Sequence, residues 1–498
     1  MMPLNTGGKN ETLKRNKKIN SIPPAHINTT YVSEKINFNS KFKIQHSTFI
    51  NQNSKLEVLI LSSIKIFLAF TTTLLILLTN LSCHRTPVEP EKTKVNLIYE
   101  DALCNEAYFR LKTTEINYPA RVDLYLNKNR VNSFTTFSED TVFVIENLLP
   151  KKSYTSYVRV YPEGGREIVS SEVSFVTMDT TSHDFTWQVF EFGGECGSSI
   201  LFDVAIIDEN NIWAVGEIYM RDSLGRCDPK AYNAIHWDGS KWELNRIFFY
   251  TFCPEGTGSG SYPATSIFAL DKENILISSG SQLAYLKNNV QVKRECIPVS
   301  VNKLWGTSSN DLYAVGYNGN IAHWDGRRWK KIESGTDVNI NEVFGVINRK
   351  TNRRIIFCSA SNLFEKGEYK ILTIDENNKI DSLHWGLDRR ISSTWSSNGW
   401  IVYTSGGGVF SNKTGRWVEE TSIPLYYTNR IRGNDYNDIF VVGDFALLAH
   451  YNGFSWKVYY ELLQLPMTSF YSISVKENMI AFVGYYGEKA LIIIGRRN

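Results

Sequence analysis

Residues 304–329, LWGTSSNDLYAVGYNGNIAHWDGRRW, and residues 431–456, IRGNDYNDIFVVGDFALLAHYNGFSW, are two copies of one pattern that align without a gap. A third, more diverged copy begins with VAIIDENNIWAVG, continues after an insertion with AIHWDGSKW, and ends at Trp242. Self-similarity at intervals of tens of residues indicates a repeat architecture, in which each unit buries its apolar surface against its neighbours. The repeat predicts a scaffold and does not by itself identify a ligand.

The first copy predicts four short strands. A strand beginning at Leu304 is followed by a turn and by residues 312–316, which are almost entirely apolar, as expected for a strand buried on both faces. Residues 321–324 form a third strand, and the Asp-Gly pair after them tolerates the positive φ angles of a hairpin turn. Trp329 then opens the fourth strand.

The spacing of the buried aromatic residue and the following Val-Gly predicts seven units of about 40 residues each. The last unit has no fourth strand before Asn498, whereas FTWQVFEF, residues 185–192, has the pattern of a fourth strand with no unit before it. We expect this segment to complete the last unit and close the ring, which removes an open sheet edge. The units are expected to start near Leu201, Thr265, Asn302, Asn341, Ser392, Asn429 and Thr468.

These units resemble bacterial extracytoplasmic propeller repeats of the W-G-x-x-x-x-D-[LIV]-[YF]-x-V-G…H-[WY]-[DN]-G-x-x-W type. The resemblance implies an all-β fold, with a seven-bladed, four-stranded β-propeller over residues 185–498. Proteins that resemble the whole chain sometimes carry the label glucosyl transferase. The sequence lacks an Asp-x-Asp motif, a phosphate-binding P-loop and a Rossmann-like βαβ pattern, so it offers no support for that label.

A separate unit over residues 95–180 precedes the repeats. The stretch LLPKKSY, which ends at Tyr154, has the L-x-P-x-x-x-Y spacing of a tyrosine corner, in which the phenol bonds to upstream backbone. The unit resembles a fibronectin type III domain, which implies a sandwich of two antiparallel sheets. It lacks the early-strand Trp of that family, and we expect Phe109 or Leu111 to fill the same place. Its simplest role is that of a spacer.

The N-terminal region predicts export. Residues 66–78, IFLAFTTTLLILL, form an apolar run that is short for a membrane-spanning helix and suits the core of a signal peptide. With NLSC following it, the segment 58–83 resembles a bacterial lipoprotein signal, which implies a lipid on Cys83. Asn80 departs from that pattern because Leu is usual there. An uncleaved membrane anchor is the alternative, and both predict that the rest of the chain lies in the cell envelope.

The segments around this signal are polar. Residues 84–94 read as a tether, and residues 1–57 as a disordered extension or a start codon assigned too early. The first 82 residues carry ten Lys or Arg and three Glu, which leaves 44 basic and 48 acidic residues in the remainder. A nearly neutral body gives no electrostatic reason to expect nucleic acid as a partner.

Three histidines invite a metal-site hypothesis. His236, His323 and His450 occupy the same position of three units, just before an Asp-Gly or Asn-Gly turn. Equivalent positions are distributed around a ring and do not converge, so we expect each histidine to make a structural hydrogen bond. We predict no metal, cofactor or catalytic residue. Carboxylate pairs for glycoside hydrolysis can come from distant positions, so a carbohydrate-active enzyme is the alternative function.

The cysteines point to one face of the propeller. Cys196, Cys227 and Cys253 fall in three loops that emerge at the same end of the first unit, and Cys296 lies near that end. In an exported protein Cys227 is expected to pair with Cys196 or Cys253, and unpaired loop cysteines are the alternative. Cys358, in the apolar run IIFCSA, is predicted to be a buried thiol.

The same face carries the long insertions EIYMRDSLGRCDPKAY and TFCPEGTGSGSYP. Long loops on a rigid scaffold are frequent binding sites. The sequence therefore predicts an exported, lipid-anchored, non-catalytic binding protein whose partner is a glycan or an envelope protein; the alternative is a glycosyl transferase or glycosidase. The candidate ligand contacts are Tyr219, Arg221, Asp222, Arg226, Tyr232, Tyr262 and Tyr485, and the face also presents Tyr426, Tyr427 and Tyr486.

Overall fold

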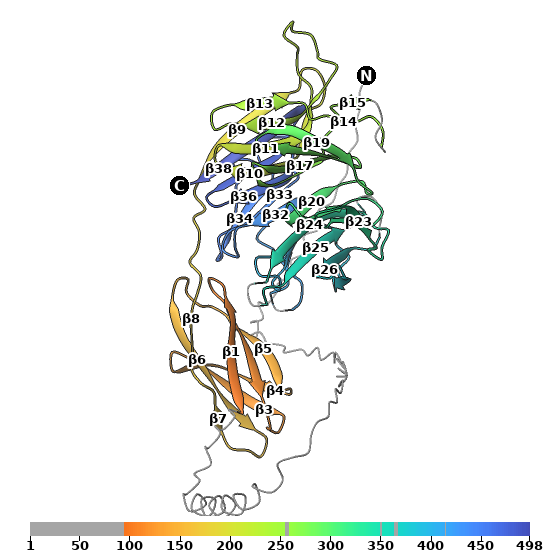
Figure 1. Ribbon diagram of the computed structural model, residues 1–498. Helices are drawn as coiled ribbons and strands as arrows, with labels where there is room; N and C mark the ends of the chain where they lie inside the picture. Colours follow the sequence, from red (N-terminus) through yellow and green to blue (C-terminus); the bar gives the residue numbers. More distant parts are fainter. Residues whose placement is uncertain (1–93, 254–257, 349–350, 363–366, 414) are drawn as a thin grey trace, which may run out of the picture. The chain divides into compact units, whose positions relative to one another are not determined.

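The computed structural model describes residues 94–498 except for four short internal gaps, and the elements it assigns there are all β-strands (Figure 1). The predicted signal, the lipidation site Cys83 and the N-terminal extension lie outside the described residues. Within those residues no helix is long and apolar enough to cross a membrane. The gaps are 254–257, 349–350, 363–366 and 414.

The first eight strands form two antiparallel sheets packed on a shared core. One sheet has the order β1-β2-β5 and the other β4-β3-β6-β7, with β8 also paired to β6 (Figure 1). The strand bounds are β1 (Val95–Ala102), β2 (Ala107–Thr113), β3 (Ala120–Leu126), β4 (Asn129–Thr136), β5 (Asp140–Ile145), β6 (Ser153–Pro162), β7 (Ile168–Val169) and β8 (Val173–Val176).

The corner predicted at Tyr154 is present. Its buried hydroxyl accepts a hydrogen bond from the Leu149 backbone N–H at 2.9 Å, so the phenol ties the β5–β6 connection to β6. Phe109 and Leu111 are both buried in the core between the two sheets. The Phe109 ring packs edge-on against Phe175 of β8, with 5.3 Å between the ring centroids. This aromatic pair joins the two sheets in a unit that lacks the early-strand Trp.

The rest of the described chain forms seven four-stranded antiparallel sheets, here called sheets 1 to 7 in chain order. Each first strand begins within one residue of the unit start predicted from the repeat. Sheet 1 contains β10 (Ile200–Asp208), β11 (Asn211–Ile218), β12 (Tyr232–Trp237) and β13 (Trp242–Asn245). Sheet 2 contains β16 (Ser266–Asp271), β17 (Asn274–Ser279), β18 (Gln282–Lys287) and β19 (Val290–Cys296). Sheet 3 contains β20 (Lys303–Ser308), β21 (Asp311–Val315), β22 (Ile321–Trp324) and β23 (Trp329–Ile332).

The later sheets repeat this order. Sheet 4 contains β24 (Ile340–Ile347), β25 (Arg354–Ala360), β26 (Lys370–Ile374) and β27 (Ile380–Leu383). Sheet 5 contains β28 (Ile391–Trp395), β29 (Tyr403–Gly406), β30 (Phe410–Ser411) and β31 (Val418–Glu419). Sheet 6 contains β32 (Thr428–Gly433), β33 (Ile439–Gly443), β34 (Leu448–Tyr451) and β35 (Trp456–Val458). Sheet 7 contains β36 (Thr468–Lys476), β37 (Met479–Tyr486), β38 (Lys489–Arg497) and β9 (Phe185–Gly193). A small hairpin, β14 (Phe249–Tyr250) with β15 (Ser259–Gly260), follows sheet 1.

The sheet layout fits a β-propeller. The first strand of each sheet contacts the first strand of the next, and β36 of sheet 7 contacts β10 of sheet 1. The segment predicted to close the ring pairs as expected, because β9 forms the fourth strand of sheet 7 along the whole length of β38. Gly495 lies opposite Trp187 in this pairing, and a Cβ there would collide with the indole ring.

Residues Pro90–Asn498 form one compact unit, in which the β1–β2 connection also packs on residues of sheets 5 and 6. The Tyr108 ring lies edge-on to Trp400 at 4.8 Å, and the Asn398 amide donates a hydrogen bond to Asp101 at 3.0 Å. Both partners lie in the β28–β29 connection.

Candidate functional site

Successive strands of each sheet run in opposite directions, so two kinds of connection emerge at the same end: those between the second and third strands, and those between one sheet and the next. We call this end the loop face. Its described segments are 194–199, 219–231, 246–253, 258–265, 280–281, 297–302, 316–320, 333–339, 361–362, 367–369, 384–390, 407–409, 420–427, 444–447, 459–467 and 487–488.

Exposed large apolar side chains gather on the loop face. Elsewhere in the seven sheets such side chains occur mainly on fourth strands, such as Val290 and Val292 of β19. Isolated exposed apolar residues are ordinary, but their concentration at one end of a scaffold marks an interaction surface. The loop-face residues of this kind are Leu224, Phe248, Phe252, Tyr262, Tyr317, Leu425, Tyr426, Phe445, Tyr460 and Met467.

The sheet 1 insertion is a small hairpin stapled to the scaffold. A disulfide joins Cys227 to Cys196, one of the two partners expected from the sequence. Arg221 pairs with Glu195 at 2.6 Å, and Arg226 pairs with Asp222 at 2.9 Å. Hydrogen bonds from the Arg226 backbone and side chain lower the pKa of the Asp222 carboxyl. The charged candidates are therefore engaged in ion pairs that hold the hairpin, with Arg221 bound to Glu195 and Arg226 to Asp222, while Leu224 at the tip is exposed.

The tyrosine candidates differ in their surroundings. The Tyr219 hydroxyl donates to Glu217 at 2.5 Å, and the Glu217 carboxylate raises the pKa of the phenol. Tyr232 lies within β12 and not in a loop, and the Arg246 guanidinium covers its ring at 3.9 Å from the centroid. Tyr262 is exposed on the connection between sheets 1 and 2. Of these three, Tyr262 is the most available to a partner.

A second disulfide, Cys253–Cys296, was not expected from the sequence. It ties the β14–β15 hairpin to the end of β19, so both long insertions are anchored covalently at the loop face. The signal was present, because Cys296 was already placed near this face. Cys358 is a buried free thiol, as predicted, and Cys104 is another.

Tyr485 belongs to an aromatic row at the junction of sheets 7 and 1. Its ring lies 5.9 Å from Tyr471, and the Tyr471 ring lies 6.1 Å from Phe202. Burial raises the pKa of Tyr471 to about 12, and the nearby phenol of Tyr485 and carboxylate of Asp444 act in the same direction. The sequence singled out Tyr485 but not the two partners that complete the row.

Each of the three repeat histidines makes a hydrogen bond within its sheet, as predicted. His236 bonds Asn211 at 2.8 Å, His323 bonds Asp311 at 2.8 Å, and His450 bonds Asp438 at 2.9 Å. Each imidazole also stacks on an aromatic ring of the second strand, at 4.3 to 4.6 Å between centroids. Among the described residues no group of three or more His, Cys, Asp or Glu side chains could hold a metal ion.

A buried ionic network lies among the first strands. Lys303 of sheet 3 contacts both carboxylate oxygens of Asp203 in sheet 1, at 2.7 and 2.6 Å. Glu342 of sheet 4 pairs with Arg430 and Arg432 of sheet 6. Burial alone would raise the pKa of Asp203, but Lys303, Arg430 and hydrogen-bond donors lower it below its ordinary value. An ionised, fully paired carboxylate is poorly suited to serve as the general acid of a glycosidase.

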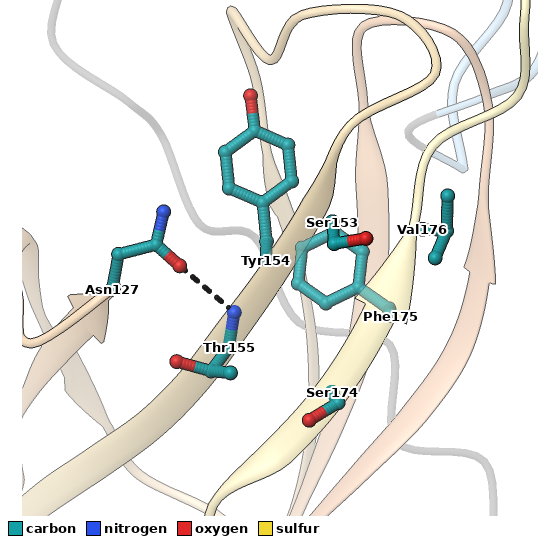
Figure 2. Close-up of a pocket in the computed structure, with 7 residues that line it drawn as sticks. All are labelled: Asn127, Ser153, Tyr154, Thr155, Ser174, Phe175 and Val176. Carbon is teal, nitrogen blue, oxygen red and sulfur yellow. Dashed lines mark hydrogen bonds between the residues drawn. The ribbon is translucent and has the colours of Figure 1, made fainter.

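A shallow pocket lies on the sandwich, between the ends of β6 and β8 (Figure 2). The Thr155 backbone N–H donates to the Asn127 side chain at 2.9 Å across one side of it. Its lining contains no carboxylate, imidazole or thiol. The lining residues are Asn127, Ser153, Tyr154, Thr155, Ser174, Phe175 and Val176.

No protein-family model and no curated protein matches the chain. Similar solved structures include "YCF48 bound to D1 peptide", 12% identical, with a TM-score of 0.43 over 64% of this chain and 97% of that chain. The Dos1 propeller is 11% identical, with a TM-score of 0.40 over 62% and 94%. The C-terminal WD40 domain of Sif2 is 10% identical, with a TM-score of 0.36 over 62% and 99%. These neighbours are β-propeller and WD40-type proteins, and at such identities the similarity concerns the type of fold alone.

Proposed function

We propose that this protein is an exported, lipid-anchored, non-catalytic binding protein of the cell envelope. In this proposal the seven sheets are the blades of a propeller, the sandwich is a fibronectin type III-like support, and Cys83 carries the lipid. The partner, a glycan or another protein, contacts the loop face.

The observation that carries the proposal is the gathering of exposed apolar side chains on the loop face, around hairpins fixed by two disulfides. A rigid scaffold that displays anchored loops loses little conformational entropy on binding. The two disulfides also favour an oxidising compartment, since such bonds are rare in the reducing cytosol.

The test uses the full chain on arrays of bacterial and plant glycans and of peptides, with bound protein and altered ligand both measured. A Leu224→Ser/Phe252→Ser variant removes one exposed apolar side chain from each of the two insertions. A Val290→Thr/Val292→Thr variant removes similar apolar surface from a fourth strand and serves as the control. We expect retention without product, reduced at least tenfold in the hairpin variant only.

Release of a product would replace the proposal with the carbohydrate-active enzyme alternative. Equal retention by both variants would contradict the loop face as the binding surface. Lipid anchoring is tested separately, because Cys83→Ser should move the protein from the membrane fraction to the soluble fraction. A Cys83→Ser protein that stays in the membrane would favour the uncleaved anchor.

A further inference from the structure

The buried ionic network among the first strands consists of five charged side chains, which we call the central cluster: Asp203, Lys303, Glu342, Arg430 and Arg432. They come from four different sheets, because the two carboxylates lie in β10 and β24, the lysine in β20 and both arginines in β32. Each side chain is at most 14% exposed, and the two carboxylates are almost completely buried. The proposed binding at the loop face does not use this cluster.

The central cluster has one more cation than it has anions. Three positive side chains face two carboxylates, and the other side chains that bond to these carboxylates are serine hydroxyls. A net positive charge that is withdrawn from water costs free energy unless a negative charge accompanies it. Folding alone gives no reason to keep a third cation beside two carboxylates.

The carboxylate of Asp203 has no capacity for a further cation. Both of its oxygens contact the Lys303 ammonium, at 2.7 and 2.6 Å. The hydroxyls of Ser266 and Ser472 and the Ile267 backbone N–H also donate to it, at 2.7 to 3.0 Å. The negative charge of Asp203 is therefore fully used within sheets 1, 2, 3 and 7.

Arg430 is the cation whose donors are least satisfied. The residue is 9% exposed, and its Nη1 contacts Glu342. Among the described residues, its buried Nε finds no hydrogen-bond acceptor. Arg432, in contrast, donates to Glu342 at 2.7 Å and to the Ser393 hydroxyl at 3.2 Å. A buried N–H without an acceptor is rare in proteins, and a bound ion is one physical explanation for it.

The surplus charge acts on Lys303 as well. Burial lowers the pKa of its ammonium to about 7, and the charges of Arg430 and Arg432 act in the same direction, while Asp203 opposes them. Two events relieve such a surplus: Lys303 loses its proton, or an anion binds. Both oxygens of Asp203 hold the charged form of Lys303, whereas Arg430 has a donor to spare. The geometry therefore favours an anion at Arg430.

The charge and size of this anion follow from the cluster. A surplus of one positive charge is matched by a monovalent anion, whereas a divalent anion would reverse the imbalance. Glu342 and Ser393, which adjoin the two arginines, are completely buried, so an ion beside them has few atoms. The N–H groups of a guanidinium are strong donors to anions because they carry positive charge.

We propose that the central cluster binds a small monovalent anion, of which chloride is the simplest example, at the Arg430 guanidinium. The anion neutralises the surplus charge and stabilises the contacts among the first strands. This inference is independent of the proposed binding function, because the cluster lies in the first strands and not in the connections of the loop face.

The experiment measures thermal unfolding of the full chain at pH 6, where Lys303 is protonated, while chloride replaces gluconate at constant ionic strength. Gluconate is too large for the site, and a constant ionic strength keeps general screening the same. Arg430→Gln removes the guanidinium. Arg327→Gln is the matched control, because it removes an exposed arginine from the β22–β23 turn.

We expect the melting temperature of the wild type and of Arg327→Gln to rise by about 3 °C between about 1 and about 300 mM chloride and then to level off, because binding to the folded state saturates. In Arg430→Gln the rise should be smaller by about threefold. No rise in the wild type overturns the inference. An equal rise in all three proteins also overturns it, because the effect is then one of the solvent.

A second measurement covers an Arg430→Gln variant that fails to fold. Anomalous diffraction from wild-type crystals grown in bromide should show a peak within hydrogen-bond distance of the Arg430 guanidinium. The inference is overturned if this position has no peak. A peak without a chloride-dependent melting temperature shows binding at crystal concentration only and likewise overturns it.

Discussion

Sheets 3 and 6 are built from the two repeat copies that align without a gap, yet they differ in the turn between their second and third strands. In both, a histidine of the third strand bonds an aspartate at the beginning of the second strand, Asp311 within β21 or Asp438 directly before β33, and stacks on an aromatic ring. At the loop face, sheet 3 uses Asn318 and Gly319, whereas sheet 6 uses Phe445 and Ala446 in the same left-handed backbone conformation. The two copies share the residues that pack inside the sheets. They differ in a turn at the loop face, where Phe445 is exposed.

The two sheets also differ in how far their aspartates are buried. Asp438 is almost fully buried and holds both His450 and Arg497, whereas Asp311 is one-fifth exposed and holds His323 and Arg354. Arg497 belongs to sheet 7, so Asp438 links two sheets next to the strand that closes the ring. The aspartate of sheet 6 is therefore more deeply buried than that of sheet 3, and the same sheet contains the turn with the disfavoured backbone conformation.

The largest expected effect breaks this framework. Asp438→Ala leaves Arg497 and His450 without their buried partner and should lower the free energy of unfolding by about 3–5 kcal/mol. Asp311→Ala should cost about 2 kcal/mol, because solvent reaches the site. Urea unfolding followed by tryptophan fluorescence compares the two. Equal losses would show that the difference in burial does not control the stability of the repeat.

The second prediction concerns the turn residue that sheet 3 retains. Gly319 has a φ of 65°, and a Cβ there would collide with the Thr336 carbonyl oxygen. Gly319→Ala should therefore cost about 2–4 kcal/mol, from the left-handed backbone and the steric conflict together. In Ala446→Gly, the loss of a buried methyl of about 0.8 kcal/mol is offset by release of the disfavoured φ.

Thermal unfolding of both variants checks this asymmetry. The expected result is a clear fall in melting temperature for Gly319→Ala and a shift near zero for Ala446→Gly. A large fall for Ala446→Gly would mean that the alanine methyl is central to the core between sheets 6 and 7. Sheet 6 would then differ from sheet 3 because of packing along its whole turn.

The third prediction uses a contact that sheet 3 lacks. His183 precedes β9, and its Nδ1 lies 2.8 Å from Nδ1 of His450. Burial lowers the pKa of His183 to about 4, with the charges of His450, Lys457 and Arg497 acting in the same direction. Since the unfolded histidine titrates near 6.5, the unfolded chain binds the extra proton between pH 6.5 and 4. Stability is full above pH 6.5 and falls as the pH drops through that window.

After allowance for the partial exposure of His183, its share of this fall is about 1–2 kcal/mol. His183→Asn should reduce the pH dependence, and chemical denaturation at pH 7, 6, 5 and 4 measures it. His323→Asn is the control, because Nδ1 of His323 faces the Asn378 amide at 3.3 Å and not a second histidine. The idea fails if His183→Asn keeps the wild-type slope.

Much of the fold could be predicted because the same residue pattern recurs in several units of the sequence. Recurring positions predict the unit starts, the closing strand and the histidine hydrogen bonds. A residue type that recurs at one position of several units indicates a structural role, whereas a single occurrence can be accidental. The tyrosine corner at Tyr154 is likewise a local pattern with one geometric solution. The lipid anchor and the spacer role are not tested by the described residues and stay predictions.

The loop face was harder to predict because it depends on contacts between segments that do not repeat. The sequence suggested Tyr232 as a ligand contact, but Arg246 covers its ring. It listed Cys253 as a possible partner of Cys227, but only the folded hairpin brings Cys253 to Cys296. Phe445 was missed, although the alignment of the two copies already placed it against Asn318. A departure from Asn-Gly in one copy was the available signal.

The smallest expected change in stability gives the sharpest test of what the two turns mean. Phe445→Asn replaces a residue that disfavours positive φ with one that tolerates it, so the free energy of unfolding should rise. Loss of the exposed ring pair with Tyr426 limits the gain to about 1 kcal/mol. The reverse change, Asn318→Phe in sheet 3, should lower stability by a similar amount, and urea unfolding of both variants measures the pair. If Phe445→Asn lowers stability instead, the ring supports the fold of sheet 6. Packing would then explain why sheet 6 departs from the Asn-Gly pair of sheet 3.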